Sequence, residues 1–219
     1  MLRSILKNFY LGSLFISLII SCSPALNYNH RGTAVITLSD IHSIINKDNS
    51  LLYKAKITLY NRYYSGLILL KQADTNTSHL VFITELGMKM FDFEIRHNQF
   101  KLIYVFEPLN KPGVLKVLEQ DLKLLLLQNL LNKEVEVFGQ KVQSKLIYRI
   151  ADHKLKNYYL VNPTTRTVNK IIVKGALFTK ETVNYIYNDS LNAKQIKLKH
   201  KGIMPLKIEL NNISTKLQQ

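Results

Sequence analysis

The feature that most constrains the fold of this chain is an alternation of apolar and polar residues, which recurs from residue 52 almost to the end. In the first run, the apolar residues of segment 53–59 alternate with Lys54, Lys56 and Thr58. Successive side chains of a β-strand point to opposite faces, so such a run buries one face and leaves the other in water. The pattern therefore predicts a sheet with one wet face.

Similar strand-like runs fill most of the remaining chain, separated by short polar gaps that are typical of hairpins. They are Tyr64–Leu70, Leu80–Thr84, Met90–Arg96, Phe100–Phe106, Val142–Ile150, Leu155–Val161, Thr167–Val173, Val183–Tyr187, Gln195–His200 and Leu206–Leu210. An antiparallel sheet of about eleven strands is too wide to stay flat comfortably. We therefore predict a mainly β chain with helices (α+β), folded as an incomplete or half β-barrel.

Two segments have helical periodicity. Ser39 and Asp40 precede three isoleucines at helical spacing, which predicts a short helix there. Pro112 can begin a second, amphipathic helix. Its leucines and two phenylalanines of the sheet are the candidates for lining a cavity: Leu115, Leu118, Leu122, Leu125, Phe91 and Phe93. The helix either fills the curled sheet or leaves room for an apolar ligand.

The N-terminus has the layout of a secretory signal peptide. Arg3 and Lys7 precede an apolar run of about twelve residues, which is shorter than the ~20 that span a bilayer. A permanent membrane helix is the weaker alternative. We predict a signal peptide over residues 1–21, a tether over 22–30 and a single half-barrel domain over 31–219.

Cys22 is the only cysteine of the 219 residues, which excludes a disulfide framework and a multi-cysteine zinc site. The segment Ile19–Cys22 resembles the lipobox of bacterial lipoproteins. That resemblance implies cleavage before Cys22 and attachment of a diacylglycerol and an N-acyl chain to it. The expected location is a lipid anchor in the outer membrane that faces the periplasm; the alternative is that Cys22 is a chance residue.

The sequence contains no constellation typical of an enzyme. Its six histidines lack metal-ligand spacing, and no nucleophile motif is present. Asp92 and Glu94 alternate with phenylalanines, so we expect them on the solvated face of a strand. We predict neither enzymatic activity nor a metal site, and no cofactor besides the acyl chains at Cys22.

The net charge of +15 is concentrated in the second half, where from Lys141 onward Lys and Arg outnumber Asp and Glu by 15 to 4. Lys197, Lys199 and Lys201 alternate with apolar residues and form a predicted basic face. Export argues against nucleic acid as a partner. Anionic lipid headgroups are a better match, and a merely solvated face is the alternative.

The order of these parts, an acylated cysteine, a short helix, a meander and a midchain helix, resembles the LolA/LolB family of lipoprotein carriers and outer-membrane receptors. Three segments carry the resemblance: Thr84–Gly87, Gln195–Lys199 and Leu206–Ile213. The resemblance implies an open barrel of about eleven strands, with helices over a hydrophobic cavity that accepts acyl chains.

The resemblance also implies a function and a site. A LolB-like protein receives acylated lipoproteins from a LolA-like periplasmic carrier and inserts them into outer-membrane lipid, as a monomer. Leu86, Gly87 and Met88 match the membrane-insertion loop, with Leu86 at the critical position; alternatively, Leu86 packs back on a neighbouring strand. The rival function is a structural or interaction lipoprotein of the cell envelope with a filled barrel.

Overall fold

The computed structural model describes residues 24–25, 28–42, 44, 50–73, 77–96, 99–139, 145–152 and 154–214. These residues form thirteen strands in one sheet. The strands are β1 (Asn29–Ile36), β2 (Leu51–Leu59), β3 (Arg62–Gln72), β4 (Thr77–Thr84), β5 (Lys89–Arg96), β6 (Gln99–Val105), β7 (Lys133–Gly139), β8 (Leu146–Asp152), β9 (Leu155–Asn162), β10 (Thr167–Lys174), β11 (Thr179–Tyr187), β12 (Ala193–His200) and β13 (Leu206–Asn212).

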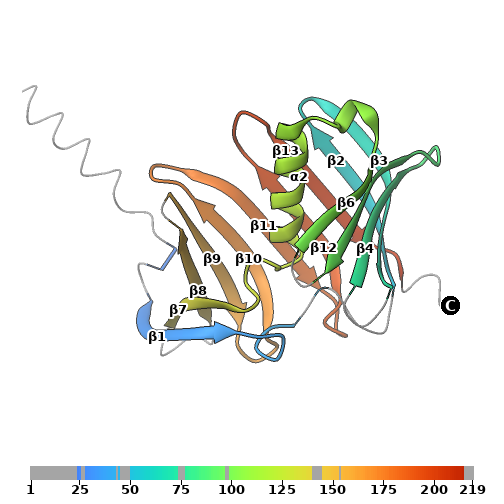
Figure 1. Ribbon diagram of the computed structural model, residues 1–219. Coiled ribbons are helices and arrows are strands. Elements are labelled where there is room, and N and C mark those ends of the chain that lie inside the picture. The colour runs from blue at the N-terminus through green and yellow to red at the C-terminus, as the bar shows by residue number, and fades with distance from the viewer. Residues whose placement is uncertain are drawn as a thin grey trace, which may run out of the picture.

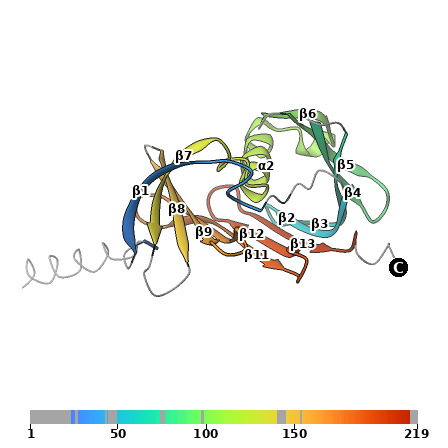
Figure 2. The same ribbon diagram turned by 90° about the horizontal axis from the view of Figure 1, so that it is seen from below.

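The sheet is antiparallel and open. Its strand order is β1-β7-β8-β9-β10-β11-β12-β13-β2-β3-β4-β5-β6, so β1 and β6 are its two edges. Most neighbours are consecutive hairpins, and the exceptions are the pairs β1 with β7 and β13 with β2. Figure 1 shows this sheet from one side, and Figure 2 shows how it curves.

Helix α2 (Pro112–Leu125) lies on the concave side of the sheet, preceded by the short 3-10 helix η1 (Glu107–Leu109) (Figure 2). Pro112 stands in the first turn, where its missing N–H costs no hydrogen bond. The buried side chains of α2, among them Leu118 and Leu122, join a continuous core with the inner face of the sheet. Tyr185 Oη on β11 donates to the Leu125 carbonyl at 2.9 Å. The helix is thus held by apolar packing and by a polar contact at its C-terminal end.

The predicted mainly β, antiparallel and incompletely closed architecture is confirmed, but the count of about eleven strands is not exact, since the described residues form thirteen. Strands β1 and β7 were not predicted. β1 is a largely exposed edge strand without apolar alternation, and its partner β7 lies about a hundred residues away in sequence. The predicted strand Val142–Ile150 corresponds to β8, which runs from Leu146 to Asp152; residues 142–144 lie outside the described residues.

A turn occupies residues 38–40, where the short helix after Ser39 was predicted to begin; residues 43 and 45–49, which would form the rest of that helix, lie outside the described residues. Asp40 Oδ2 accepts hydrogen bonds from Thr37 N at 2.8 Å and from Thr37 Oγ1 at 2.7 Å. The carboxylate therefore bonds backwards to Thr37 instead of forwards to a helical N–H, which is the alternative use of a short polar side chain. Within the described residues, α2 and η1 are the helices, and none of them is long and apolar enough to cross a membrane.

A smaller apolar cluster covers the outer face of the sheet near β7 and β8. It consists of Ala25, Phe138, Ile147 and Tyr158. Ala25 belongs to the segment predicted as a tether, so part of that segment lies against the sheet. Cys22 and the predicted signal peptide lie outside the described residues.

Gly66 on β3 occupies a position without space for a side chain. A Cβ atom there would lie 2.0 Å from the Ile83 carbonyl oxygen of the neighbouring strand β4. Because backbone atoms of a paired strand cannot swing aside, Gly66→Ala is expected to lower the free energy of unfolding by about 1–3 kcal/mol. Urea unfolding would measure the change, with the adjacent Ser65→Ala as control. Equal stability of Gly66→Ala and the wild type would contradict the prediction.

Candidate functional site

The turn between β4 and β5 presents Leu86 to solvent. The turn is closed by hydrogen bonds from Gly87 N to Thr84 O and from Thr84 N to Met88 O, both at 2.9 Å. Gly87 has a φ of +79°, a conformation that glycine adopts without strain. Leu86 is 93% exposed, and Met88 is also exposed. The tip therefore holds a leucine away from its own sheet, as an inserting side chain requires.

A pocket of about 490 Å³ lies between the β2–β3 turn, the start of α2 and Met204. Its apolar wall includes Leu59, Leu109, Val114 and Met204. Arg62 and Lys111 add two cations to its lining. Its volume is in the range of small-ligand sites, which are mostly apolar with a few polar groups. The pocket thus has the chemistry of a site for an amphiphile with an anionic or ester end.

The residues predicted to line a cavity lie elsewhere. Phe91, Phe93, Leu118, Leu122 and Leu125 are all buried in the main core, and Leu115 is half-buried. None of the six lines the described pocket. Their part in ligand binding stays a prediction. It requires α2 to move away from the sheet, because these side chains are otherwise in contact with the core.

The predicted basic face has an exposed, mixed surface. Lys197 and Lys199 are exposed on β12 and stand opposite Glu209 and Lys207 of β13. Lys201 lies past the strand end, where its N–H donates to Lys180 O at 2.7 Å. The three lysines therefore do not form one continuous face. Lys197 and Lys199 lie on the outer face of the sheet, and Lys201 lies at the end of β12.

Asp92, predicted to be solvated, is buried. His79 Nδ1 lies 3.2 Å from Asp92 Oδ1, and Lys89 Nζ lies 3.5 Å from Oδ2. These two neighbours cover the carboxylate on the outer face of β5. The alternation correctly placed Asp92 on that face, but the predicted exposure of its side chain is wrong.

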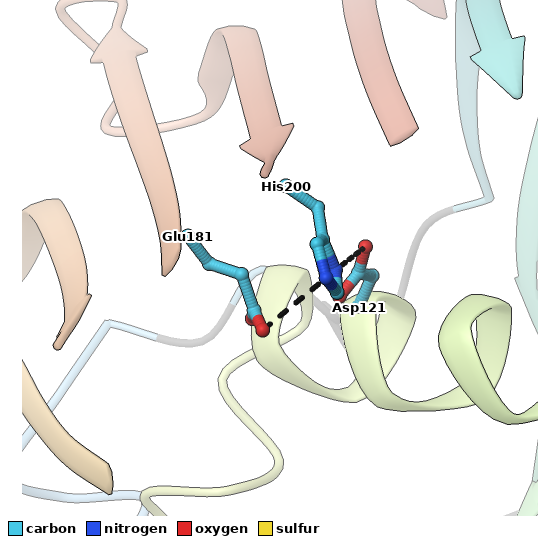
Figure 3. A group of neighbouring side chains, drawn as sticks. All are labelled: Asp121, Glu181 and His200. Carbon is cyan, nitrogen blue, oxygen red and sulfur yellow. Dashed lines mark hydrogen bonds and ion pairs between the residues drawn. The ribbon is translucent and has the colours of Figure 1, made fainter. Parts of the chain in front are cut away.

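A cluster of three ionisable side chains joins α2 to the sheet (Figure 3). His200 Nδ1, at the end of β12, lies 3.0 Å from both carboxylate oxygens of Asp121 on α2. Glu181 Oε1, on β11, lies 3.7 Å from the same nitrogen. Asp121 is fully buried, and the side chains of His200 and Glu181 are mostly buried. We call these three residues the helix–sheet cluster.

Burial and mutual contact shift the pKa values of the cluster. The hydrogen bond to Asp121 raises the pKa of His200. Burial raises the pKa of Asp121. Burial, and then repulsion by Asp121, raises the pKa of Glu181 to about 7. Protonated His200 therefore neutralises Asp121 in a place where an unpaired carboxylate would be costly.

The helix–sheet cluster could not be predicted from residue spacing, because its members are 19 to 79 residues apart in the chain. One signal was present: Asp121 stands among the leucines of the apolar helix face, where a charged residue needs a partner. One histidine nitrogen and one oxygen from each carboxylate lie within 4.8 Å of one another, a spacing at which a divalent cation could be held. The hydrogen bonds between His200 and Asp121 account for the geometry as an ion pair.

The cluster makes stability depend on pH. The pKa of Glu181 is about 7 in the folded chain against a reference of 4.5, so its stabilising contribution is complete below pH 4.5 and is lost as the pH rises to about 7. The raised pKa values of Asp121 and His200 act in the same direction, and Lys180 and Tyr159 are the other titratable groups facing the cluster.

We expect the free energy of unfolding to fall between pH 5 and 7.5, by about 3 kcal/mol from Glu181. Urea unfolding across this window measures the slope, which Glu181→Gln should flatten. Glu209→Gln, at an exposed site on β13, should leave it unchanged. A slope that Glu181→Gln does not alter would contradict the assignment.

Comparisons with known proteins add structures but no sequence relatives. No protein-family model matches the chain, and no curated protein matches it. Among solved structures, this chain is similar to LolA-superfamily and lipoprotein-sorting proteins.

Three of these structures illustrate the extent of the similarity. A LolA superfamily protein from Nitrosomonas europaea has a TM-score of 0.46 and 8% identity, over 83% of this chain and 93% of that one. A DUF1329 family protein from Desulfovibrio piger has a TM-score of 0.39 and 8% identity, over 78% and 86%. An outer membrane lipoprotein-sorting protein domain from Vibrio parahaemolyticus has a TM-score of 0.39 and 10% identity, over 80% and 86%.

Proposed function

We propose that this chain is a LolB-like lipoprotein that binds the acyl chains of other lipoproteins and inserts them into the outer membrane. The observation that carries the proposal is the 93% exposed Leu86, at the end of a hairpin on the curved sheet. The protein would work as a monomer, anchored through acyl chains on Cys22 and facing the periplasm. Its cargo would come from a LolA-like periplasmic carrier.

The pocket supplies a starting point for acyl-chain binding. Leu59, Val114 and Met204 offer apolar contact, and Arg62 and Lys111 offer charge to the polar end of the cargo. Because no covalent bond of the cargo has to break, the proposal requires binding and release rather than catalysis. Release requires a membrane that receives the acyl chains better than the pocket does; in the bilayer each buried acyl CH₂ gains about 0.8 kcal/mol relative to water.

Binding of a fluorescent diacylated lipopeptide tests the proposal directly. Met204→Glu removes apolar contact from the pocket wall and places an anion that competes with the polar end of the cargo for Arg62 and Lys111, so it is expected to weaken binding by about tenfold or more. Leu67→Glu is the matched control, because Leu67 is exposed on β3 and does not line the pocket. Equal binding by both variants would remove the pocket from the proposal.

One observation favours a second function. The inner residues of α2 and β5, such as Leu122 and Phe91, are buried in the core, and a filled interior suits a structural or interaction lipoprotein of the envelope. Wild-type protein that fails to bind the lipopeptide would favour this alternative.

A further inference from the structure

Four hairpin turns lie side by side at one end of the sheet, where strands begin and end. Backbone hydrogen bonds connect neighbouring members of this row. Lys201 N donates to Lys180 O, which joins the β12–β13 turn to the start of β11. Tyr60 N donates to Pro205 O, and Glu85 N donates to Ser65 O. These bonds add the β2–β3 and β4–β5 turns to the row. Figure 1 shows the four turns along the upper side of the sheet; we call this side the tip edge.

Three hairpins of the tip edge expose large apolar side chains at their ends. Leu86 is 93% exposed, Ile203 is 96% exposed, and Leu177 and Phe178 are 78% and 64% exposed. They come from three different turns, β4–β5, β12–β13 and β10–β11. Single exposed leucines are ordinary on protein surfaces, but several on neighbouring tips mark an interaction surface.

The opposite edge of the sheet has a different composition. Its described hairpin turns are 163–166, with the sequence Pro-Thr-Thr-Arg, and 188–192, with the sequence Asn-Asp-Ser-Leu-Asn. Leu191 is only partly exposed there, and Leu38, which is exposed, belongs to a turn beside Arg166 rather than to a hairpin tip. Exposed apolar hairpin ends are therefore concentrated on the tip edge of the described chain.

The charge of the tip edge is positive. Its basic residues are Arg62, Lys89, Lys111, Lys174, Lys180 and Lys201. The exposed acidic residues of the described edge are Glu85, Glu107 and Asp152; Asp152 lies at the end of the β8–β9 hairpin, where the exposed Lys154 adds a further cation. Apolar side chains that project beyond a ring of cations are complementary to a bilayer with anionic headgroups, where each nearby Lys or Arg strengthens attachment about fivefold.

We propose that the tip edge as a whole docks on an anionic phospholipid membrane, with Ile203, Leu177 and Phe178 entering the lipid together with Leu86. The inference rests on the proposed function for the membrane as acceptor, but it names a broader contact than a single loop. Three separated tips fix the orientation of the domain, whereas one tip would leave it free to rotate. In this orientation the pocket, lined by residues of the same edge such as Tyr60 and Lys111, is held next to the acceptor bilayer.

The chain contains no tryptophan, so one introduced residue can report its own surroundings. We would compare Phe178→Trp, Ile203→Trp and Leu86→Trp with Ser190→Trp, a control at the exposed β11–β12 turn of the opposite edge. The full chain would be reconstituted in vesicles of phosphatidylcholine and phosphatidylglycerol with brominated acyl chains. A tryptophan in the lipid shifts its emission to the blue and is quenched.

We expect a blue shift and loss of most emission at all three tips, none at Ser190→Trp, and a weaker effect in vesicles without phosphatidylglycerol. A response confined to Leu86→Trp, or an equal response at Ser190→Trp, would overturn the proposal. Lipopeptide transfer is measured on the same variants. Transfer without a response at Phe178→Trp and Ile203→Trp would refute the tip edge and leave the proposed function standing, whereas lipid entry without transfer by the wild type would refute the function alone.

Discussion

Replacement of Leu86 by glutamate is expected to abolish delivery of an acylated lipoprotein to vesicles while the fold stays intact. Leu86 is 93% exposed, so the folded chain loses little packing. A leucine gains about 0.5 kcal/mol in a membrane, whereas an acidic residue costs about 2.5–3.5 kcal/mol at its centre. If insertion of this side chain accompanies transfer, the rate should fall on the order of 100-fold.

The assay mixes a loaded carrier, the variant and vesicles, and follows the appearance of lipoprotein in the vesicle fraction. Leu86→Met is the matched control, because it keeps an apolar side chain of similar size at the same turn and should retain transfer. Circular dichroism and the urea midpoint check that both variants fold. Transfer by Leu86→Glu at the wild-type rate would remove Leu86 from the mechanism.

Truncation of Leu122 to alanine is expected to have the largest effect on stability. Leu122 is fully buried on α2, in the core that this helix shares with the sheet. Removing such a side chain costs about 2–5 kcal/mol of unfolding free energy, because the surroundings only partly close the cavity. The urea midpoint measures the loss, and Gln120→Ala, at an exposed site on the same helix, serves as control.

The result also bears on the choice between a carrier and a structural protein. A cost near 2–5 kcal/mol would mean that α2 packs firmly in the free protein, so an acyl chain could enter the interior only if the helix moves. A cost below about 1 kcal/mol would contradict full packing and indicate an interior already open to ligand.

Much of the fold could be predicted because its contacts are local. Strands β8 to β13 and β2 to β6 are joined mainly by short hairpins, so alternation and turns define both the strands and their neighbours. β1 escaped prediction because an exposed edge strand has no buried face to pattern. β7 is an internal strand in which Glu134 and Glu136 alternate with Val135 and Val137, so its alternation was a usable strand signal. The Asp40 carboxylate could either cap a following helix or accept hydrogen bonds from residues before it. In the structure it accepts them from Thr37.

Some features of the candidate site were indicated by the sequence, and others depend on contacts between distant segments. The family resemblance pointed to Leu86, and the turn glycine beside it made an exposed leucine one of two expectations. The structure shows Leu86 exposed, and its part in membrane insertion stays a prediction. The pocket was not predicted, because its walls come from the β2–β3 turn, η1, α2 and Met204. The tip edge was not predicted either, because the pairing order of distant strands brings Leu177, Phe178 and Ile203 to one side.

By itself, the sequence determined that the chain forms a wide antiparallel sheet with one apolar face, a leucine-rich helix and an apolar turn at Leu86. These properties follow from residue periodicity, which acts over a few neighbours. Only the tertiary structure decided that the sheet has thirteen strands, that Asp121 meets His200 and Glu181, and that the tips share an edge. The reason is physical: burial of a charge and the exposure of a tip depend on which distant segments pack nearby, and one-dimensional spacing does not record that choice.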